Sequence, residues 1–201
     1  MSEFERWETR FSAPDYVFGT APNAFLAAQK PHLPRTGRAL AVADGEGRNG
    51  VWLAEQGLDV LSLDFSPAAQ AKARALAQAR HVSITTEIAD ITTWSWPEAQ
   101  FDVVAVIFTQ FTGPAERAVM FDRIRKALKP GGLLLMQGYT PRQLHYGTGG
   151  PKQIENLYTR ALLEQAFASM SELRIEEREC EIQEGSGHAG MSAVIDLVAR
   201  K

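Results

Sequence analysis

The sequence predicts a three-layer α/β fold, in which helices cover both faces of a seven-stranded, mostly parallel sheet. Three observations lead to this prediction. Strand-like and helix-like patterns alternate from residue 38 to residue 139. A glycine-rich turn at residues 44–50 follows the first strand-like run. Two further strand-like runs close the chain, and the connection between them is too short for a parallel return.

The strands of the parallel part are apolar runs that end in turn residues. We expect them at residues 38–43, 59–63, 82–88, 101–108 and 133–137. The run at 101–108 is apolar almost throughout, as expected for a central strand that is buried on both faces. Because helical segments separate these strands, right-handed crossovers should connect them.

The intervening segments carry helix signals. A short helix is expected at 49–56, before Gly57. Ser66 and Pro67 suit the start of an alanine-rich helix that runs to Arg80. Residues 116–128 place apolar side chains at helical spacing, and Lys-Pro-Gly-Gly at 129–132 ends that helix.

The last third of the chain has a different pattern. A helix is expected around residues 159–169, followed by strands at 173–182 and 191–199. The glycine-rich connection at 184–190 makes these two strands an antiparallel hairpin.

Composition places the chain among ordinary globular proteins. It has 201 residues, 45% of them hydrophobic, and a formal net charge of −3. This length fits one domain, residues 1–201, with residues 1–36 as an N-terminal helical segment that suits a lid. No basic stripe is present, so nucleic acid is not the expected partner, and oligomeric state is left open.

Other sequence features bear on location. The single cysteine, Cys180, excludes an intramolecular disulfide and a cysteine-based zinc site. The N-terminus is acidic and polar, unlike a signal peptide, and no apolar stretch is long enough to span a membrane. We therefore expect a cytoplasmic protein without a membrane partner. The spacing of the histidines gives no support for a metal site.

The strongest motif is the glycine loop at residues 44–50, Asp-Gly-Glu-Gly-Arg-Asn-Gly. Glycines at 45, 47 and 50 permit a tight turn and a close approach of a ligand to the backbone. The same spacing occurs in dinucleotide-binding loops. Asp64, at the end of the second strand, is placed to accept hydrogen bonds from a ribose diol.

Over nearly the whole chain, the sequence resembles the class I S-adenosylmethionine-dependent methyltransferases. The features that carry the resemblance are the glycine loop at 44–50, Asp64, Ala89-Asp90, Phe101-Asp102, Leu128–Gly132 and the terminal hairpin. The resemblance implies a Rossmann-like fold that binds S-adenosylmethionine and releases S-adenosylhomocysteine. A small molecule would then accept the methyl group.

The resemblance also implies roles for matching residues. Asp44 would meet the methionine amine, Asp64 the ribose hydroxyls and Asp90 the adenine amine. Ile91 would pack near the adenine ring, and Phe108 would lie beside the methionine moiety. The full set of expected cofactor-binding residues is Asp44, Gly45, Glu46, Gly47, Arg48, Asn49, Asp64, Phe65, Ala89, Asp90, Ile91 and Phe108.

A nicotinamide-dependent dehydrogenase would also explain the glycines and Asp64. However, only about 60 residues follow the fifth strand, which leaves little chain for a substrate domain. The charge of Asp44 would also be unfavourable beside a pyrophosphate. The methyltransferase interpretation is therefore favoured.

Three segments are expected to reach the acceptor at the carboxyl edge of the sheet: the N-terminal segment, the loop after the fifth strand, and the hairpin connection. They provide the expected substrate-binding residues Tyr16, Phe18, Tyr139 and Arg142. They also provide the candidate catalytic residues His145, His188 and Tyr146. If the sixth strand is parallel to the others, His145 and His188 can converge, and either suits a general base.

Within the family, the sequence most resembles small bacterial methyltransferases related to tellurite-resistance and thiopurine-type enzymes. The matching motifs are Trp7-x-x-Arg10-Phe11, Tyr16-x-Phe18-Gly19-x-x-Pro22-Asn23 and Glu46-Gly47-Arg48-Asn49. This resemblance implies a thiol or a chalcogen compound as acceptor. Phe-Thr-Gln-Phe at 108–111 differs from the Asn/Asp-Pro-Pro-Tyr/Phe signature of amino-group methyltransferases. A non-catalytic S-adenosylmethionine-binding module and an RNA methyltransferase are the alternatives.

Overall fold

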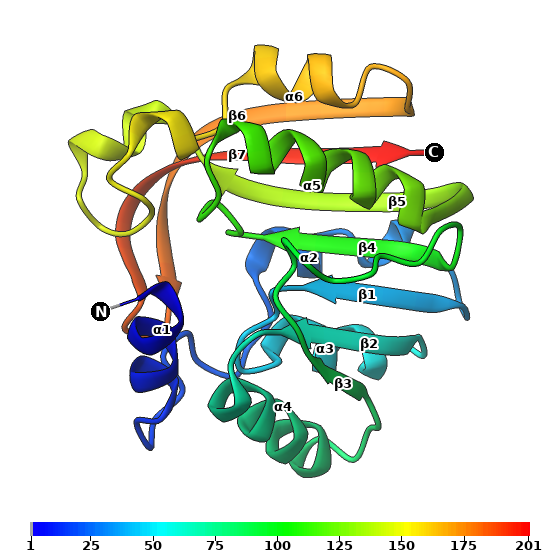
Figure 1. The fold of residues 1–201 in the computed structure, drawn as a ribbon, viewed down its shortest axis with the longest axis vertical. Helices are drawn as coiled ribbons and strands as arrows, with labels where there is room; N and C mark the ends of the chain where they lie inside the picture. Colours follow the sequence, from blue (N-terminus) through cyan, green and yellow to red (C-terminus); the bar gives the residue numbers. More distant parts are fainter. Residues whose placement is uncertain (1) are drawn as a thin grey trace.

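A computed structural model describes residues 2–201 and confirms the predicted fold class. A seven-stranded sheet lies between helices, with the strand order β3-β2-β1-β4-β5-β7-β6 (Figure 1). All neighbouring strands pair in parallel except β7, which is antiparallel to both β5 and β6. The strands are β1 (Arg38–Val42), β2 (Asp59–Asp64), β3 (Thr85–Ile88), β4 (Phe101–Ile107), β5 (Leu128–Tyr139), β6 (Ser171–Glu184) and β7 (His188–Arg200).

Four of the six α-helices in residues 2–201 begin at a side-chain cap, and α3 and α5 begin after a glycine. Ser2 and Glu5 form a reciprocal capping box on the first helix, and Ser66 and Thr159 cap two others. The α-helices are α1 (Glu3–Phe11), α2 (Ala24–Ala28), α3 (Arg48–Glu55), α4 (Pro67–Ala79), α5 (Pro114–Ala127) and α6 (Arg160–Ala166). Short 3₁₀ turns are η1 (Lys30–His32), η2 (Pro141–His145) and η3 (Ile154–Asn156). No helix among residues 2–201 is both long and apolar enough to cross a bilayer.

Side chains alternate between the two faces of the sheet and divide the core into two clusters. In β1, Leu40 and Val42 pack into the cluster beneath α5 and α6. Ala39, in the same strand, joins the opposite cluster with α2 and α3. Because β4 is covered on both faces, its side chains are apolar at almost every position, as the sequence predicted for residues 101–108.

The hairpin of β6 and β7 turns at the carboxyl edge of the parallel strands. β6 is antiparallel to β7, and β7 is antiparallel to β5, so β6 runs in the same direction as β5. The turn therefore meets the N-terminal segment, where the Gly187 amide donates to the Val17 carbonyl at 3.0 Å. Figure 1 shows α1 and the curved ends of β6 and β7 together at this edge.

Several elements differ in extent from the prediction, and β6 and β7 are each longer at both ends. The predicted strand at 82–88 is observed only from Thr85, because the Val82 amide still donates to Ala77 at the end of α4. β5 begins at Leu128, which pairs with Phe101 ahead of a shift in register, so Lys-Pro-Gly-Gly lies within a strand. The helix predicted at 159–169 ends at Ala166.

Candidate active site

A cavity of about 320 Å³ opens at the carboxyl ends of β1, β2 and β4. The glycine loop between β1 and α3 forms one wall of this cavity. Ala43, Gly45 and Gly47 all have positive φ angles, of 48°, 58° and 86°, which fold the loop back on itself. A side chain at position 47 would collide with Ala73 of α4, so glycine is required there.

Asp44 occupies the space beside the start of α3. A side chain at position 50 would collide with its carboxylate, and the Gly50 amide instead donates to Asp44 Oδ1 at 3.1 Å. The Ser62 hydroxyl donates to the other oxygen at 2.8 Å. An acidic side chain thus takes an amide at the helix start that a bound phosphate would otherwise use. The loop therefore disfavours a pyrophosphate.

Asp64 lines the same cavity from the end of β2. Its two oxygens accept from the amides of Gly45, at 2.8 Å, and Ser66, at 2.9 Å. Burial raises the pKa of Asp64 to about 6 and that of Asp44 to about 7. Within residues 2–201, no cationic side chain forms an ion pair with either carboxylate. These two buried acids suit a ligand that brings its own positive charge and hydroxyl donors.

The far end of the cavity lies beyond β3. Ala89, Asp90 and Ile91 line it, together with Phe65. Asp90 is held by its neighbour Thr92, whose amide and hydroxyl donate to Oδ1 at 2.8 and 2.7 Å. Three apolar side chains and one carboxylate suit a flat heterocycle with an exocyclic amine.

Phe108 begins an aromatic wall at the end of β4. It has a φ of 55°, and its amide donates to Gln137. Its ring stacks on Tyr139, with centroids 4.6 Å apart, and meets His188 edge-on at 4.5 Å. Phe18 packs on the other side of His188, also at 4.5 Å. Trp7 completes the wall, 6.2 Å from Phe18.

A second cavity of about 850 Å³ shares this wall with the first. His188, Phe18 and Phe108 line both cavities, so they lie at the boundary between them. Tyr139 and the glycine-rich loop at 147–150 line only the second cavity. The Tyr139 hydroxyl is buried, and within residues 2–201 it has no hydrogen-bond partner.

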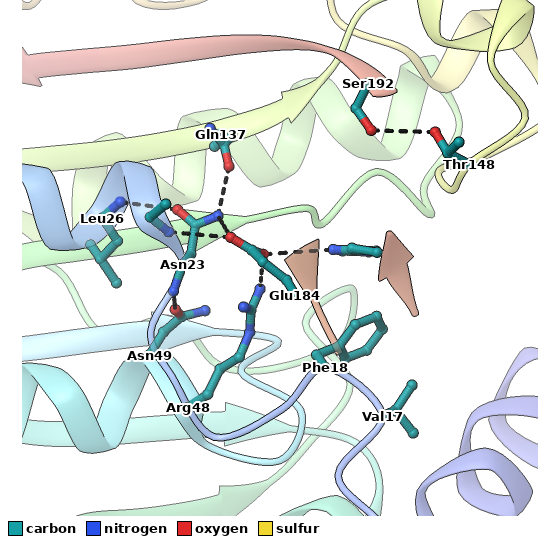
Figure 2. A network of polar contacts seen from close by, with 12 residues as sticks. Val17, Phe18, Asn23, Leu26, Arg48, Asn49, Gln137, Thr148, Glu184 and Ser192 are labelled. Atoms are coloured by element: carbon teal, nitrogen blue, oxygen red, sulfur yellow. Dashed lines mark hydrogen bonds and ion pairs between the residues drawn. The ribbon is translucent and has the colours of Figure 1, made fainter. Parts of the chain in front are cut away.

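A buried ionic network lies behind this wall (Figure 2). Glu184, the last residue of β6, accepts from Arg48 at 2.6 Å and from the Asn23 side chain at 3.0 Å. His188 Nδ1 lies 3.9 Å from the same carboxylate. Asn23 also donates to Gln137 of β5 at 2.6 Å. The network therefore joins the N-terminal segment, α3, β5 and the hairpin.

Burial and the charges of the network together shift the pKa of His188. Burial alone would raise the pKa of Glu184, but contacts with His188 and Arg48 outweigh it and hold that pKa at about 2. Burial, with help from Arg48, lowers the pKa of His188 despite Glu184. The imidazole is therefore neutral at neutral pH, with an ionised carboxylate facing Nδ1. The Cδ2 edge approaches Gly149 on the side of the second cavity.

Most of the expected cofactor-binding residues meet around the first cavity, and two do not. Glu46 points away from it, because its carboxylate binds Lys72 at 2.8 Å and accepts from the Val17 amide at 2.8 Å. Gly47 shapes the turn against Ala73 and does not line the cavity. Those that line it are Asp44, Gly45, Arg48, Asn49, Asp64, Phe65, Ala89, Asp90, Ile91 and Phe108.

The expected substrate and catalytic residues divide in the same way. Phe18, Tyr139 and His188 line the cavities, but Arg142 and Tyr146 turn outward to Glu179 of β6. The remaining two, Tyr16 and His145, line neither cavity: Tyr16 donates to the Lys72 carbonyl at 3.1 Å, and His145 is exposed. The expected convergence of His145 with His188 is therefore not observed.

Sequence reasoning missed several residues of the site. Trp7 is not among the expected site residues, yet it lines both cavities beside Phe18. Phe11 and Thr112 also line the first cavity. Glu184 was read as part of the connection after β6. Glu184 is the last residue of β6, and the other acidic residues of this strand are exposed. Its place at the strand end is the only sequence signal that could have identified it as a site residue.

Comparison with known proteins agrees with this geometry. Residues 39–132 match the family described as "Methyltransferase domain". A carboxy-S-adenosyl-L-methionine synthase from Geobacter metallireducens is 35% identical over 99 residues, 47% of this chain and 38% of that protein. A demethylmenaquinone methyltransferase from Thermus thermophilus is 31% identical over 106 residues, 52% of this chain and 48% of that protein. The matches thus span less than half the length of these curated relatives.

Solved structures resemble the fold over most of the chain. The structure describing conversion of a disulfide bond into a thioacetal group during echinomycin biosynthesis has a TM-score of 0.75 and 18% identity, covering 99% of this chain and 91% of that one. TehB from Haemophilus influenzae has a TM-score of 0.70 and 16% identity, covering 100% and 67%. A SAM-dependent methyltransferase from Methanosarcina mazei has a TM-score of 0.69 and 18% identity, covering 85% and 95%. These likenesses establish the Rossmann-like methyltransferase fold.

Proposed function

We propose, from the premise that residues 39–132 form an S-adenosylmethionine-dependent methyltransferase domain, that this chain methylates a small molecule with a soft nucleophile, a thiol or a chalcogen compound. The observation that carries the cofactor assignment is the pair of buried carboxylates, Asp44 and Asp64, without cationic partners among the described residues. The amine of the cofactor would bind at Asp44 and its ribose hydroxyls at Asp64. Its adenine would lie between Ile91 and Phe65, beside Asp90.

When bound, S-adenosylmethionine supplies an activated methyl group, whose transfer to a thiol sulfur leaves S-adenosylhomocysteine and one proton to be removed. His188 is suited to take that proton, because its imidazole is neutral and lies between the two cavities. Glu184 acts as a positioning residue, whose charge favours the tautomer with the proton on Nδ1 and leaves Nε2 free to accept. The rings of Phe18, Phe108 and Tyr139 exclude water from the reacting atoms.

The acceptor assignment is supported by the wall between the cavities. It is aromatic and apolar, and it offers one neutral base rather than several fixed hydrogen-bond acceptors. Polarisable sulfur and selenium pack well against aromatic rings. The net charge of −3 gives no support to the RNA methyltransferase alternative.

The test is a methyl-transfer assay with S-adenosylmethionine and a panel of thiols, selenite and tellurite, with the methylated product identified by mass spectrometry. We expect a methyl thioether from at least one thiol, and a loss of kcat/KM of about 10²- to 10⁴-fold in His188→Asn. Phe108 and Asp64 remain in that variant, so its affinity for S-adenosylhomocysteine should change little. Binding of S-adenosylhomocysteine without transfer to any acceptor would favour the non-catalytic module.

A further inference from the structure

An exposed positive charge lines the second cavity, and no carboxylate of residues 2–201 forms an ion pair with it. Three basic side chains line it, namely Arg6, Arg10 and Lys152, and two acidic ones, namely Glu3 and Glu155. Arg6 is paired with Glu3 at 2.7 Å on the surface of α1. Lys152 and Glu155 are exposed in the loop after β5, and Arg10 is exposed on α1. Within residues 2–201, Arg10 has no carboxylate at ion-pair distance, although it is the cation nearest to the aromatic wall.

The guanidinium of Arg10 is held in place without a counter-ion. It lies over the ring of Trp7, 5.1 Å from the centroid, and over the ring of Phe18, at 5.2 Å. Gly187 leaves room for it, because a Cβ there would lie 2.9 Å from Arg10 Nη2. Stacking fixes the plane of the guanidinium while its N–H groups keep their capacity to donate.

The surroundings of Arg10 do not supply the missing charge. The carboxylate of Glu46 is already bound to Lys72 at 2.8 Å, and that of Glu184 to Arg48 at 2.6 Å. Desolvation, followed by the charge of Arg6, lowers the pKa of Arg10, and Glu46 does not compensate for them. An anion from a ligand would therefore improve the electrostatics of this position.

We propose that the second cavity binds the methyl acceptor as an organic anion, with its anionic group at Arg10 and its apolar body along the aromatic wall. This inference rests on the proposed function and narrows its substrate class. An anionic group at Arg10 places the rest of the molecule along Phe18 and Phe108, toward His188 at the boundary with the first cavity. Arg10 is thus a specificity-determining residue for the acceptor.

The test compares two aryl thiols of equal size, 4-mercaptobenzoate and 4-mercaptobenzamide, which differ in charge. Their dissociation constants are measured by calorimetry, on the free chain and on the chain saturated with S-adenosylhomocysteine. We expect the carboxylate to bind about tenfold more tightly than the amide. Arg10→Gln should abolish this preference by weakening carboxylate binding alone, and Arg10→Lys should restore part of it.

Two matched controls separate the site from general surface charge. Arg6→Gln, one turn away on α1, and Lys152→Gln, in the opposite loop, should keep most of the preference for the carboxylate. A wild-type protein that does not distinguish the two thiols, or a preference that survives in Arg10→Gln, would overturn the proposal. Circular dichroism and the melting temperature of Arg10→Gln check that α1 remains folded.

Selenite is titrated in parallel. If selenite binding depends on Arg10 and the protein does not distinguish the two aryl thiols, the proposal of an organic anion is overturned. Arg10 would then bind a small oxyanion. Failure of the proposed function is read separately, because it appears as absent S-adenosylhomocysteine binding or as absent methyl transfer in the assay described above. In that case, the dissociation constants of the two thiols measured on the free chain still show whether the carboxylate is preferred.

Discussion

At the scale of single residues, the site depends on where two carboxylates end their strands. Asp44 and Asp64 follow β1 and β2, and parallel pairing brings them to one edge of the sheet. The sequence predicted this placement, because apolar runs ending in Asp show where buried strands stop. It did not predict that Asp44 would bind the Gly50 amide and so occupy part of the start of α3. That contact requires a loop conformation that residue spacing alone does not determine.

Asp64→Ala tests the ribose role. The change removes an acceptor for two charge-assisted hydrogen bonds, so the affinity for S-adenosylhomocysteine should fall by about 100-fold. Isothermal titration calorimetry measures the affinity, and a thermal melt confirms that the variant is folded. Asp59→Ala, at the exposed start of the same strand, serves as the matched control. Unchanged affinity in Asp64→Ala would contradict the assignment.

Asp44 makes cofactor binding dependent on pH. Its pKa is raised to about 7, and the ammonium of the ligand needs the ionised form. Binding should therefore release a proton near pH 7, and below that pH it should weaken by up to about tenfold per unit. Calorimetry of S-adenosylhomocysteine binding from pH 5.5 to 7.5, in buffers of different ionisation enthalpy, measures both effects. Asp44→Asn should bind weakly at every pH and lose most of the proton release.

The same shift affects the stability of the free chain. A carboxyl whose pKa is raised on folding stabilises the native state fully below its unfolded pKa of about 3.8. This contribution is lost as pH rises through about 6 for Asp64 and about 7 for Asp44. A bound ligand with a positive charge would offset this loss of stability, because it would pair with the ionised carboxylates.

At the scale of elements, the site depends on four segments that the network around Glu184 joins: the N-terminal segment, α3, β5 and the hairpin. Local signals predicted each segment separately, including the antiparallel hairpin that carries His188. Their meeting was not predictable, because the pairing of Glu184 with Arg48 and Asn23 joins residues far apart in the chain. The outward turn of Arg142 and Tyr146 has the same origin, since both bind Glu179 across the loop. Sequence pattern shows which loops reach the edge, and side-chain partners decide which residues face the cavity.

Glu184→Gln should destabilise the protein strongly. The Arg48 and Glu184 side chains are 7% and 9% exposed, so the change leaves a buried cation without its partner. We expect the free energy of unfolding to fall by about 3 kcal/mol, measured by urea denaturation. Glu179→Gln removes the partner of Arg142, whose side chain is 70% exposed, and should change stability by less than about 1 kcal/mol. Equal effects of the two substitutions would contradict the importance of the buried network.

At the scale of the whole molecule, the sheet brings the cofactor cavity and the acceptor cavity to the same edge. The glycine loop and the ends of β2 and β3 form the first, and the N-terminal segment, β5 and the hairpin form the second. The alternation of strands and helices was sufficient to predict this order. The aromatic wall is predicted only in part: the sequence singles out Phe18, Phe108, Tyr139 and His188 as site residues, but not Trp7. Helical periodicity does not distinguish a side chain that packs into a core from one that lines a cavity.

The most direct test of the central claim is calorimetric titration of the purified chain with S-adenosylmethionine, S-adenosylhomocysteine and NADH. The buried acid at the start of α3 should admit the first two, with micromolar dissociation constants, and exclude the pyrophosphate of the third. Binding of NADH alone would contradict the account and make residues 44–50 a dinucleotide loop.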